Sequence, residues 1–174
     1  MIAYLNGEFK VKNPAYFIVE CNGVGYQVNI SLNTFSKLQT LDKGKIHTYL
    51  HIREDAQILY GFADESEKNL FISLISVQGV GTNTARMILS SMSPADLEEA
   101  IRTENDVLIQ RIKGVGPKTA KRLVIDLKDK IGKGAGATEN SFGFGHNTMK
   151  EEALSALAML GFTRQQGEKA IGSA

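Results

Sequence analysis

The residues of this chain best suited to chemistry surround one glycine turn, within the sequence RIKGVGPKTAKRLVIDL from Arg111 to Leu127. Gly114 and Gly116 allow a sharp backbone turn and leave no Cβ between the backbone and a ligand. Pro117 follows at a position typical of a helix start, where its missing N–H has no cost. The free amides and the positive dipole end of such a helix suit an anion. The pattern therefore predicts a phosphate-binding turn.

Basic residues gather around this turn, and no acid occurs between residues 111 and 122. They are Arg111, Lys113, Lys118, Lys121 and Arg122. Two helices must position them. The first carries the apolar residues Val107, Leu108, Ile109 and Ile112, and the second repeats apolar residues at helical spacing, from Ala120 through Leu123, Val124 and Leu127 to Ile131.

The same unit occurs 35 residues earlier, where Gly79-Val80-Gly81 matches Gly114-Val115-Gly116. The Thr-Ala step and the apolar period match as well, so we predict two helix-hairpin-helix units related by a pseudo-twofold axis. Such a pair could hold both strands of a duplex without reading bases. The predicted phosphate-binding residues are Gly79, Val80, Gly81, Asn83 and Thr84 in the first unit, and Gly114, Val115, Gly116, Lys118, Thr119 and Lys121 in the second.

Two simpler interpretations compete with this one. A Gly-x-Gly between helices is also typical of a plain αα-hairpin turn, and basic residues often form a solvated helix face, although the duplication argues against both. A nucleotide loop needs Gly-Lys-Ser/Thr directly after a strand. Here Pro117 intervenes and a helix precedes, so we expect no ATP and no other cofactor bound by this chain.

Composition limits the possible settings. The chain has 174 residues, 43% of them apolar, and a net charge of only +1, so any affinity for nucleic acid must come from a local patch. Cys21 is the single cysteine, and it predicts a reduced compartment and a buried structural thiol. No signal peptide or long apolar run is present, so we expect a cytoplasmic protein. His47, His51 and His146 lack ligand-spaced partners and are interpreted as structural or exposed, with no metal site.

Residues 1–63 are typical of a small β-barrel. Five strands are expected, at residues 2–11 with an interruption at Gly7, 16–20, 24–30, 45–52 and 56–62. Asn22-Gly23 is a strong hairpin signal. This pattern favours an OB-type barrel, with an SH3-like barrel as the alternative. Between the last two strands, Glu54 and Asp55 form an acidic turn. It is either an ordinary exposed turn or, if the chain holds DNA, a wedge that repels phosphates.

The rest of the chain is expected to be helical, giving an α+β multidomain fold. Residues 64–131 hold the two hairpins, with helix starts expected at Ser93-Pro94 and around Thr103 and Asp106. Residues 132–147 contain five glycines and predict a flexible linker. Residues 148–174 form a short helical unit, which either docks another protein or packs on the main body.

Several segments together resemble the RuvA family of Holliday junction branch migration subunits. They are the opening MIAYLNG, the turn Asn22 to Tyr26, Arg53 to Gln57 leading into Tyr60-Gly61-Phe62, and the two hairpins. The likeness spans residues 1–131 and, more loosely, 148–172. It implies an OB-fold domain, a tandem hairpin domain and a mobile C-terminal domain, with no catalytic residue in the chain.

The resemblance also implies partners and roles. A homotetramer, alone or stacked as a double tetramer, would hold a four-way junction open, with Glu54 and Asp55 as the acidic pin at the crossover. The C-terminal unit would bind a RuvB-type ATPase, which uses the ATP and magnesium, through Leu157, Leu160 and Phe162. A RuvC-type junction resolvase would be a further partner.

The chain departs from the family pattern in two places, and each departure is expected to affect function. The first hairpin has Thr82-Asn83 where the family often has Pro-Lys, so we expect it to bind phosphate less strongly than the second. The chain ends at Ala174, before the third helix usual in the family's last domain, which would affect coupling to the ATPase.

Other functions remain open at this stage. Helix-hairpin-helix glycosylases and lyases need a catalytic residue facing a flipping pocket. Asp126 and Asp129 follow the second hairpin, but Asp126 lies too early on its helix to face such a pocket. The barrel could instead bind single strands, although its charge is low. Sequence-independent binding of ordinary duplex is the third alternative.

Overall fold

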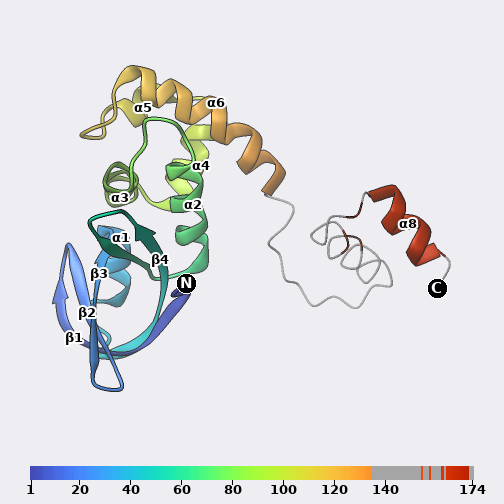
Figure 1. Ribbon diagram of the computed structural model, residues 1–174. Helices are drawn as coiled ribbons and strands as arrows, with labels where there is room; N and C mark the ends of the chain where they lie inside the picture. Colours follow the sequence, from blue (N-terminus) through green and yellow to red (C-terminus); the bar gives the residue numbers. More distant parts are fainter. Residues whose placement is uncertain (135–153, 155–156, 158–161, 163, 173–174) are drawn as a thin grey trace. The chain divides into compact units, whose positions relative to one another are not determined.

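The computed structural model describes residues 1–134, 154, 157, 162 and 164–172. Two compact units make up the chain, Met1–Ala137 and Thr138–Ala174. The first holds a barrel followed by helices (Figure 1).

The barrel is closed, with the strand order β1-β2-β3-β5-β4. Its elements are β1 (Tyr4–Asn13), β2 (Tyr16–Cys21), β3 (Val24–Ile30), α1 (Leu32–Leu38), β4 (Lys43–Ile52) and β5 (Gln57–Phe62). β3 and β5 pair in parallel, whereas the other neighbours are antiparallel. Five strands in this closed order, with α1 between β3 and β4, are the OB arrangement, so the OB-type prediction is confirmed over the SH3-like alternative.

Local sequence explains most of this barrel. Asn22 and Gly23 both adopt positive φ, 50° and 84°, as a two-residue hairpin with the right twist requires. Alternate residues of a strand point to the same face, so the side chains of Phe17, Val28 and Ile46 lie in the barrel core. All three are fully buried.

Two predictions for the barrel were wrong. Gly7 does not interrupt β1, and the register shift lies between Phe9 and Val11. A Cβ at Gly7 would lie 2.1 Å from the Glu20 carbonyl oxygen, so the glycine permits close strand approach. Cys21 is half-buried rather than buried, because it is the last residue of β2. Its thiol donates to the Asn6 carbonyl at 3.4 Å.

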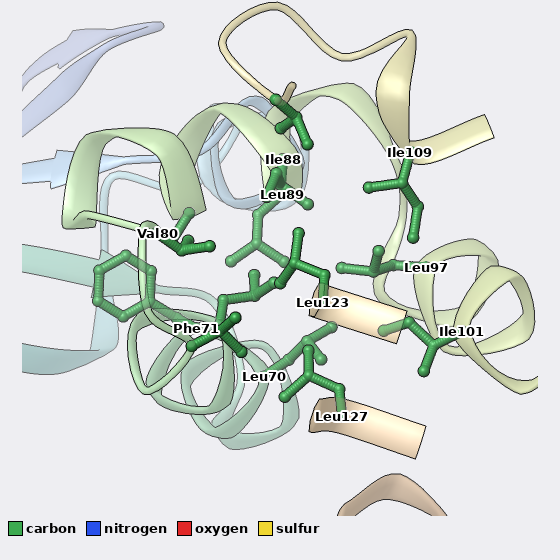
Figure 2. Close-up of a cluster of buried hydrophobic side chains, with 14 of the residues drawn as sticks. Leu70, Phe71, Val80, Ile88, Leu89, Leu97, Ile101, Ile109, Leu123 and Leu127 are labelled. Atoms are coloured by element: carbon green, nitrogen blue, oxygen red, sulfur yellow. The ribbon is translucent and has the colours of Figure 1, made fainter. Parts of the chain in front are cut away.

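Within residues 1–134, five helices follow the barrel. They are α2 (Glu65–Ile75), α3 (Thr82–Ser91), α4 (Pro94–Arg102), α5 (Asp106–Gln110) and α6 (Pro117–Gly134). Their apolar faces meet in one core, in which Leu70 and Phe71 of α2, Leu89 of α3 and Leu123 of α6 come together (Figure 2). Tyr60 and Phe62 of β5 belong to the same core, so the barrel and the hairpins pack against each other.

Helix ends differ from the expected positions in two places. The cap of α5 is Asn105, whose side chain accepts from the Leu108 N–H, and Asp106 is already the first helical residue. Thr103 is instead the C-cap residue of α4, after Arg102. α6 continues through Gly134, so helix covers the first three residues of the segment predicted as a linker. Extending an existing helix costs far less than starting one, and a glycine adds only about 1 kcal/mol. Residues 135–147 lie outside the described residues.

A buried polar cluster joins the barrel to α2. Glu67 is fully buried and accepts hydrogen bonds from the hydroxyls of Ser31 and Thr34, the latter at 2.8 Å. The Thr34 hydroxyl oxygen in turn accepts from the Ala63 N–H at 3.1 Å. Burial raises the pKa of Glu67, and the two hydroxyl bonds oppose this effect. The cluster fixes the barrel relative to the helix that leads into the first hairpin.

The second unit is described only in part. α8 spans Arg164–Gly172, and Leu154 and Leu157 are also helical. Of the predicted docking residues, Leu157 is half-buried, Phe162 is 52% exposed, and Leu160 lies outside the described residues. Among the residues that the structure describes, none of the helices combines the length and the apolar character needed to cross a membrane.

Candidate nucleic-acid interface

The two glycine turns have nearly the same backbone. Gly79 has φ 92° and Gly114 has φ 91°, a conformation that favours glycine. Each turn is followed directly by a helix, α3 or α6. The structure therefore contains the duplicated hairpin that the 35-residue repeat predicts.

The two glycines of each turn have separate roles. The first takes the positive φ that reverses the chain. The second, Gly81 or Gly116, has an ordinary φ, and an added Cβ there would meet nothing within 4 Å. Space is therefore open in front of the second glycine, where a ligand could approach the backbone.

The valines between the glycines are anchors rather than phosphate donors, which corrects the sequence-based prediction. Val80 and Val115 are 5% and 6% exposed, with side chains in the helical core. Their N–H groups are engaged as well, donating to Val77 O at 3.0 Å and Ile112 O at 3.1 Å. Both valines hold the turn against the core and offer no free amide.

The free amides begin at the second glycine, because the N–H groups of Gly81 and Gly116 have no partner among the described residues. In both hairpins the first helical backbone bond is made four residues on, from Ala85 N to Gly81 O and from Ala120 N to Gly116 O, each at 2.9 Å. The N–H groups before it have no partner within the helix. Gly81 provides no side-chain cap for α3. The donors available to an anion are thus those of residues 81–84 in the first hairpin and of residues 116, 118 and 119 in the second.

The cationic side chains are divided unequally between the hairpins. Lys118 and Lys121 are exposed on α6, next to the second turn. Their counterparts on α3 are the neutral Asn83 and Arg86, whose guanidinium donates to the Ala15 carbonyl at 3.1 Å. The hairpin residues themselves therefore place less positive charge at the first turn than at the second.

Direct contacts fix the two turns relative to each other. The Arg122 guanidinium donates to the Gln78 side-chain oxygen at 2.8 Å, which joins α6 to the first turn. A Cβ built on Gly79 would lie 4.0 Å from the Thr119 hydroxyl oxygen. The barrel adds another link, because the Tyr60 hydroxyl bonds to the Thr82 hydroxyl at 2.9 Å.

The acidic turn lies between β4 and β5. Glu54 and Asp55 are both exposed, and the turn is closed by a bond from Arg53 N to Ala56 O of 2.8 Å. The Arg53 Nε atom lies 3.7 Å from Asp55 Oδ1, and this pair is open to solvent. Such an exposed pair stabilises the fold little, which leaves the acids free to act on a nearby ligand.

A hollow beside the first hairpin was missed by the sequence analysis. Its volume is about 410 Å³, and its walls come from β4 and from the start of α3. Tyr49, His51 and Arg53 line it on the barrel side, facing Gly81 to Thr84. Period-2 alternation puts Tyr49 and His51 on the face of β4 opposite Ile46 and Thr48, and Arg53 follows the end of the strand. This alternation was the signal in the sequence that could have predicted the hollow. In the described part of the chain, no three His, Cys, Asp or Glu residues are grouped as metal ligands.

Comparison with known proteins decides the family. The family description "RuvA N terminal domain" matches residues 1–61, and "SAM-like Helix-hairpin-helix tandem" matches residues 71–129. A Holliday junction branch migration complex subunit RuvA from Christiangramia forsetii is 50% identical over 171 residues, covering 98% of this chain and 88% of the relative. The chain belongs to the RuvA family.

Other relatives agree with this assignment. The RuvA subunits of Cytophaga hutchinsonii and Bacteroides fragilis are 47% and 49% identical, and the matches cover 97% and 98% of this chain and 87% and 89% of those relatives. The region that matches the RuvA N terminal domain contains the acidic turn, and the region that matches the helix-hairpin-helix tandem contains both glycine turns. The resemblance stated from the sequence is thereby confirmed, and so is the order of an OB-fold barrel and a tandem hairpin domain.

Proposed function

We propose that this chain binds four-way DNA junctions without reading base sequence, as the scaffold subunit of a branch migration complex. The observation that carries the proposal is the pair of matching hairpins. Each presents free amides at a helix start, and direct contacts fix them relative to each other. Two rigidly linked phosphate sites suit the two strands of one duplex arm.

The acidic turn would supply the preference for a junction. Exposed carboxylates repel phosphates, so Glu54 and Asp55 would favour DNA whose strands separate near them. We expect four copies to place four arms around these acids, as a homotetramer or as two stacked ones. Site residues in the hairpins are Gly81, Asn83, Thr84, Gly116, Lys118, Thr119 and Lys121, with Gly79 and Gly114 shaping the turns.

In this proposal the chain contributes no catalytic group. A separate RuvB-type ATPase would move the arms, using ATP and magnesium, and a RuvC-type resolvase would act on the same junction. The second unit would dock the ATPase through the surface that includes Leu157 and Phe162, with Leu160 as its third proposed member. DNA as substrate and a single reduced thiol both favour the cytoplasm.

A competition experiment tests the proposal. Labelled four-way junction is bound and challenged with excess linear duplex of the same sequences, with and without magnesium. Binding that survives the duplex supports a structure-specific scaffold. Equal competition by the duplex would reduce the function to general double-strand binding, and the acidic turn would lose its assigned role.

A further inference from the structure

The first hairpin lacks the cation that the second one carries. Asn83 takes the position of Lys118 in the 35-residue repeat, and Arg86 bonds to the Ala15 carbonyl at 3.1 Å. Free amides alone bind an anion less strongly than amides combined with a charged side chain. If both hairpins hold phosphates, charge must reach the first one from another element.

The barrel has residues in the right place. The hollow of about 410 Å³ has Arg53 and His51 on the barrel side and Thr82, Asn83 and Thr84 on the hairpin side. Arg53 is exposed, and its one ion pair in the described part of the chain, with Asp55, is long at 3.7 Å. His51 stacks on Tyr49, with ring centroids 6.5 Å apart, which orients its imidazole.

The two walls of this hollow are held together. Tyr60 of β5 is buried and bonds through its hydroxyl to Thr82, the first residue of α3, at 2.9 Å. Tyr49 packs edge-on against Phe71 of the helical core, with centroids 5.6 Å apart. The spacing between the barrel cations and the hairpin amides is therefore set by the folded core rather than by the DNA.

We infer that the first phosphate site is composite, and that Arg53 and His51 of the barrel complete it. The ligand is a DNA backbone phosphate, held by the amides of residues 82–84 on one side and by the guanidinium and imidazole N–H groups on the other. This assigns His51 a binding role, in contrast to the structural role expected from its sequence context. Arg53 and His51 would offset the weaker phosphate binding that is expected of the first hairpin alone. The inference rests on the proposed DNA-binding function.

The decisive test combines two substitutions across the hollow. Arg53→Gln should weaken binding of both a four-way junction and a linear duplex, and should lower the salt slope of log K by about 0.9 for each phosphate that the guanidinium neutralises. Asn83→Lys places the missing cation on the opposite wall. It should therefore restore most of the affinity in the Arg53→Gln protein while adding much less to the wild type.

Controls separate this role from others that Arg53 could have. Arg53→Lys keeps the charge and should retain most of the affinity, whereas Lys10→Gln removes an exposed cation of β1 and should change little. If Asn83→Lys raised DNA affinity equally in the wild type and in the Arg53→Gln protein, the inference would be overturned and Arg53 would be assigned to the acidic turn. The inference would also be overturned if Asn83→Lys restored no DNA affinity to an Arg53→Gln protein that unfolds normally in urea.

His51 has its own matched pair of variants. His51→Gln keeps an N–H donor and should bind nearly as the wild type does, whereas His51→Leu should weaken binding. Equal affinities for the two variants would remove His51 from the site. Binding of both the four-way junction and the linear duplex is measured. A wild-type chain that does not prefer the junction would refute the proposed function, and the duplex affinities of the variants would still test this phosphate site.

Discussion

Lys118 is the residue on which the phosphate assignment of the second hairpin most directly depends. It is exposed at the second position of α6, beside amides that have no partner within the helix. A lysine on a phosphate contributes charge and carries no base information. We therefore expect Lys118→Ala to weaken binding of all DNA sequences alike and to reduce the salt slope by about 0.9 for each phosphate that the lysine neutralises. Filter binding of several unrelated duplexes at graded salt measures this.

The exposed Lys10, which pairs with Glu8 on β1, offers a control for Lys118. Its replacement by alanine removes the same charge from β1, a strand that contributes to neither glycine turn. A change in preference among sequences of equal structure in the Lys118 variant would contradict the phosphate assignment.

Glu67 makes a prediction about stability rather than binding. Burial raises its pKa above the ordinary value of 4.5. Between that value and the raised pKa, the folded chain keeps a proton that the unfolded chain has released. The free energy of unfolding must therefore fall as pH rises through this interval. Glu67→Gln has no such proton, so its unfolding free energy should depend less on pH there, as measured by urea unfolding from about pH 4 to pH 8.

Two further variants define the part played by Glu67. Glu67→Ala leaves the hydroxyl donors of Ser31 and Thr34 without their acceptor and should cost about 1–3 kcal/mol. The exposed Glu98→Gln removes a carboxylate at the surface as a control. Identical pH profiles for wild type and Glu67→Gln would show that burial does not perturb this group.

Sequence reasoning at the residue scale succeeded where a local rule applied. The positions of the glycine turns and the acidic turn follow from spacing and turn chemistry. The hydrogen-bond partners of individual amides and side chains could not be predicted from the sequence, because they depend on tertiary contacts. Val80 and Val115 use their amides for bonds inside the turn, and Arg86 reaches a carbonyl 71 residues away. Glu67 gave no signal either, since an acid near a helix start is normally exposed.

At the scale of the element, the two glycines of each hairpin turn have different roles: the first is needed for folding and the second for DNA binding. Gly114 has φ 91°, so Gly114→Ala strains the backbone and should destabilise the chain by about 1–3 kcal/mol. Gly116 has an ordinary φ and open space, so Gly116→Ala should change the unfolding free energy by less than about 0.5 kcal/mol. Its methyl group would nevertheless occupy the approach of a phosphate and weaken DNA binding.

Urea unfolding and DNA binding of both variants measure this contrast. The pair Gly79→Ala and Gly81→Ala repeats it in the first hairpin, where φ is 92° at Gly79 and the space at Gly81 is open. Undiminished DNA affinity in a well-folded Gly116→Ala protein would mean that the backbone there does not approach the ligand.

Elements were predictable where one pattern dominated. Five strands and the hairpin helices follow from alternation, helical period and glycine punctuation. The end of α6 was not predictable from the sequence. The helix continues through Gly134 because adding a residue to an existing helix is easier than starting a helix, even where the residue is a glycine. The strand through Gly7 depends on the Glu20 carbonyl opposite it, which a single sequence does not reveal. The hollow between β4 and α3 likewise needs the packing of two domains.

The second unit matters at the scale of the whole molecule. Phe162 is 52% exposed, and its N–H donates to the Leu157 carbonyl at 3.1 Å. An exposed aromatic residue on a small helical unit is suited to anchor a partner. Phe162→Ser should therefore leave junction binding unchanged and weaken binding of a RuvB-type ATPase about tenfold or more. Ile125→Ser, which removes a 69% exposed apolar residue from α6, is the control. Equal ATPase binding by wild type and Phe162→Ser, by calorimetry, would locate the docking surface elsewhere.

The acidic turn provides the test of how the assembled molecule distinguishes a junction from a duplex. Neutralising it with Glu54→Gln and Asp55→Asn removes two exposed negative charges. Affinity should rise for both DNA forms, and more for continuous duplex, because its phosphates cannot separate around the acids. The ratio of junction to duplex affinity should therefore fall. Screening beyond about 10 Å at 0.1 M salt should shrink the difference as salt increases.

A second doubly neutralised variant shows whether position or total charge produces this effect. Glu65→Gln with Glu98→Gln removes two exposed carboxylates from α2 and α4 and leaves the turn intact. It should raise both affinities slightly and leave their ratio unchanged. If the two double variants shift the ratio equally, net charge alone accounts for the preference. If the turn variant alone lowers the ratio, the position of Glu54 and Asp55, rather than the total charge of the chain, produces the preference for a junction.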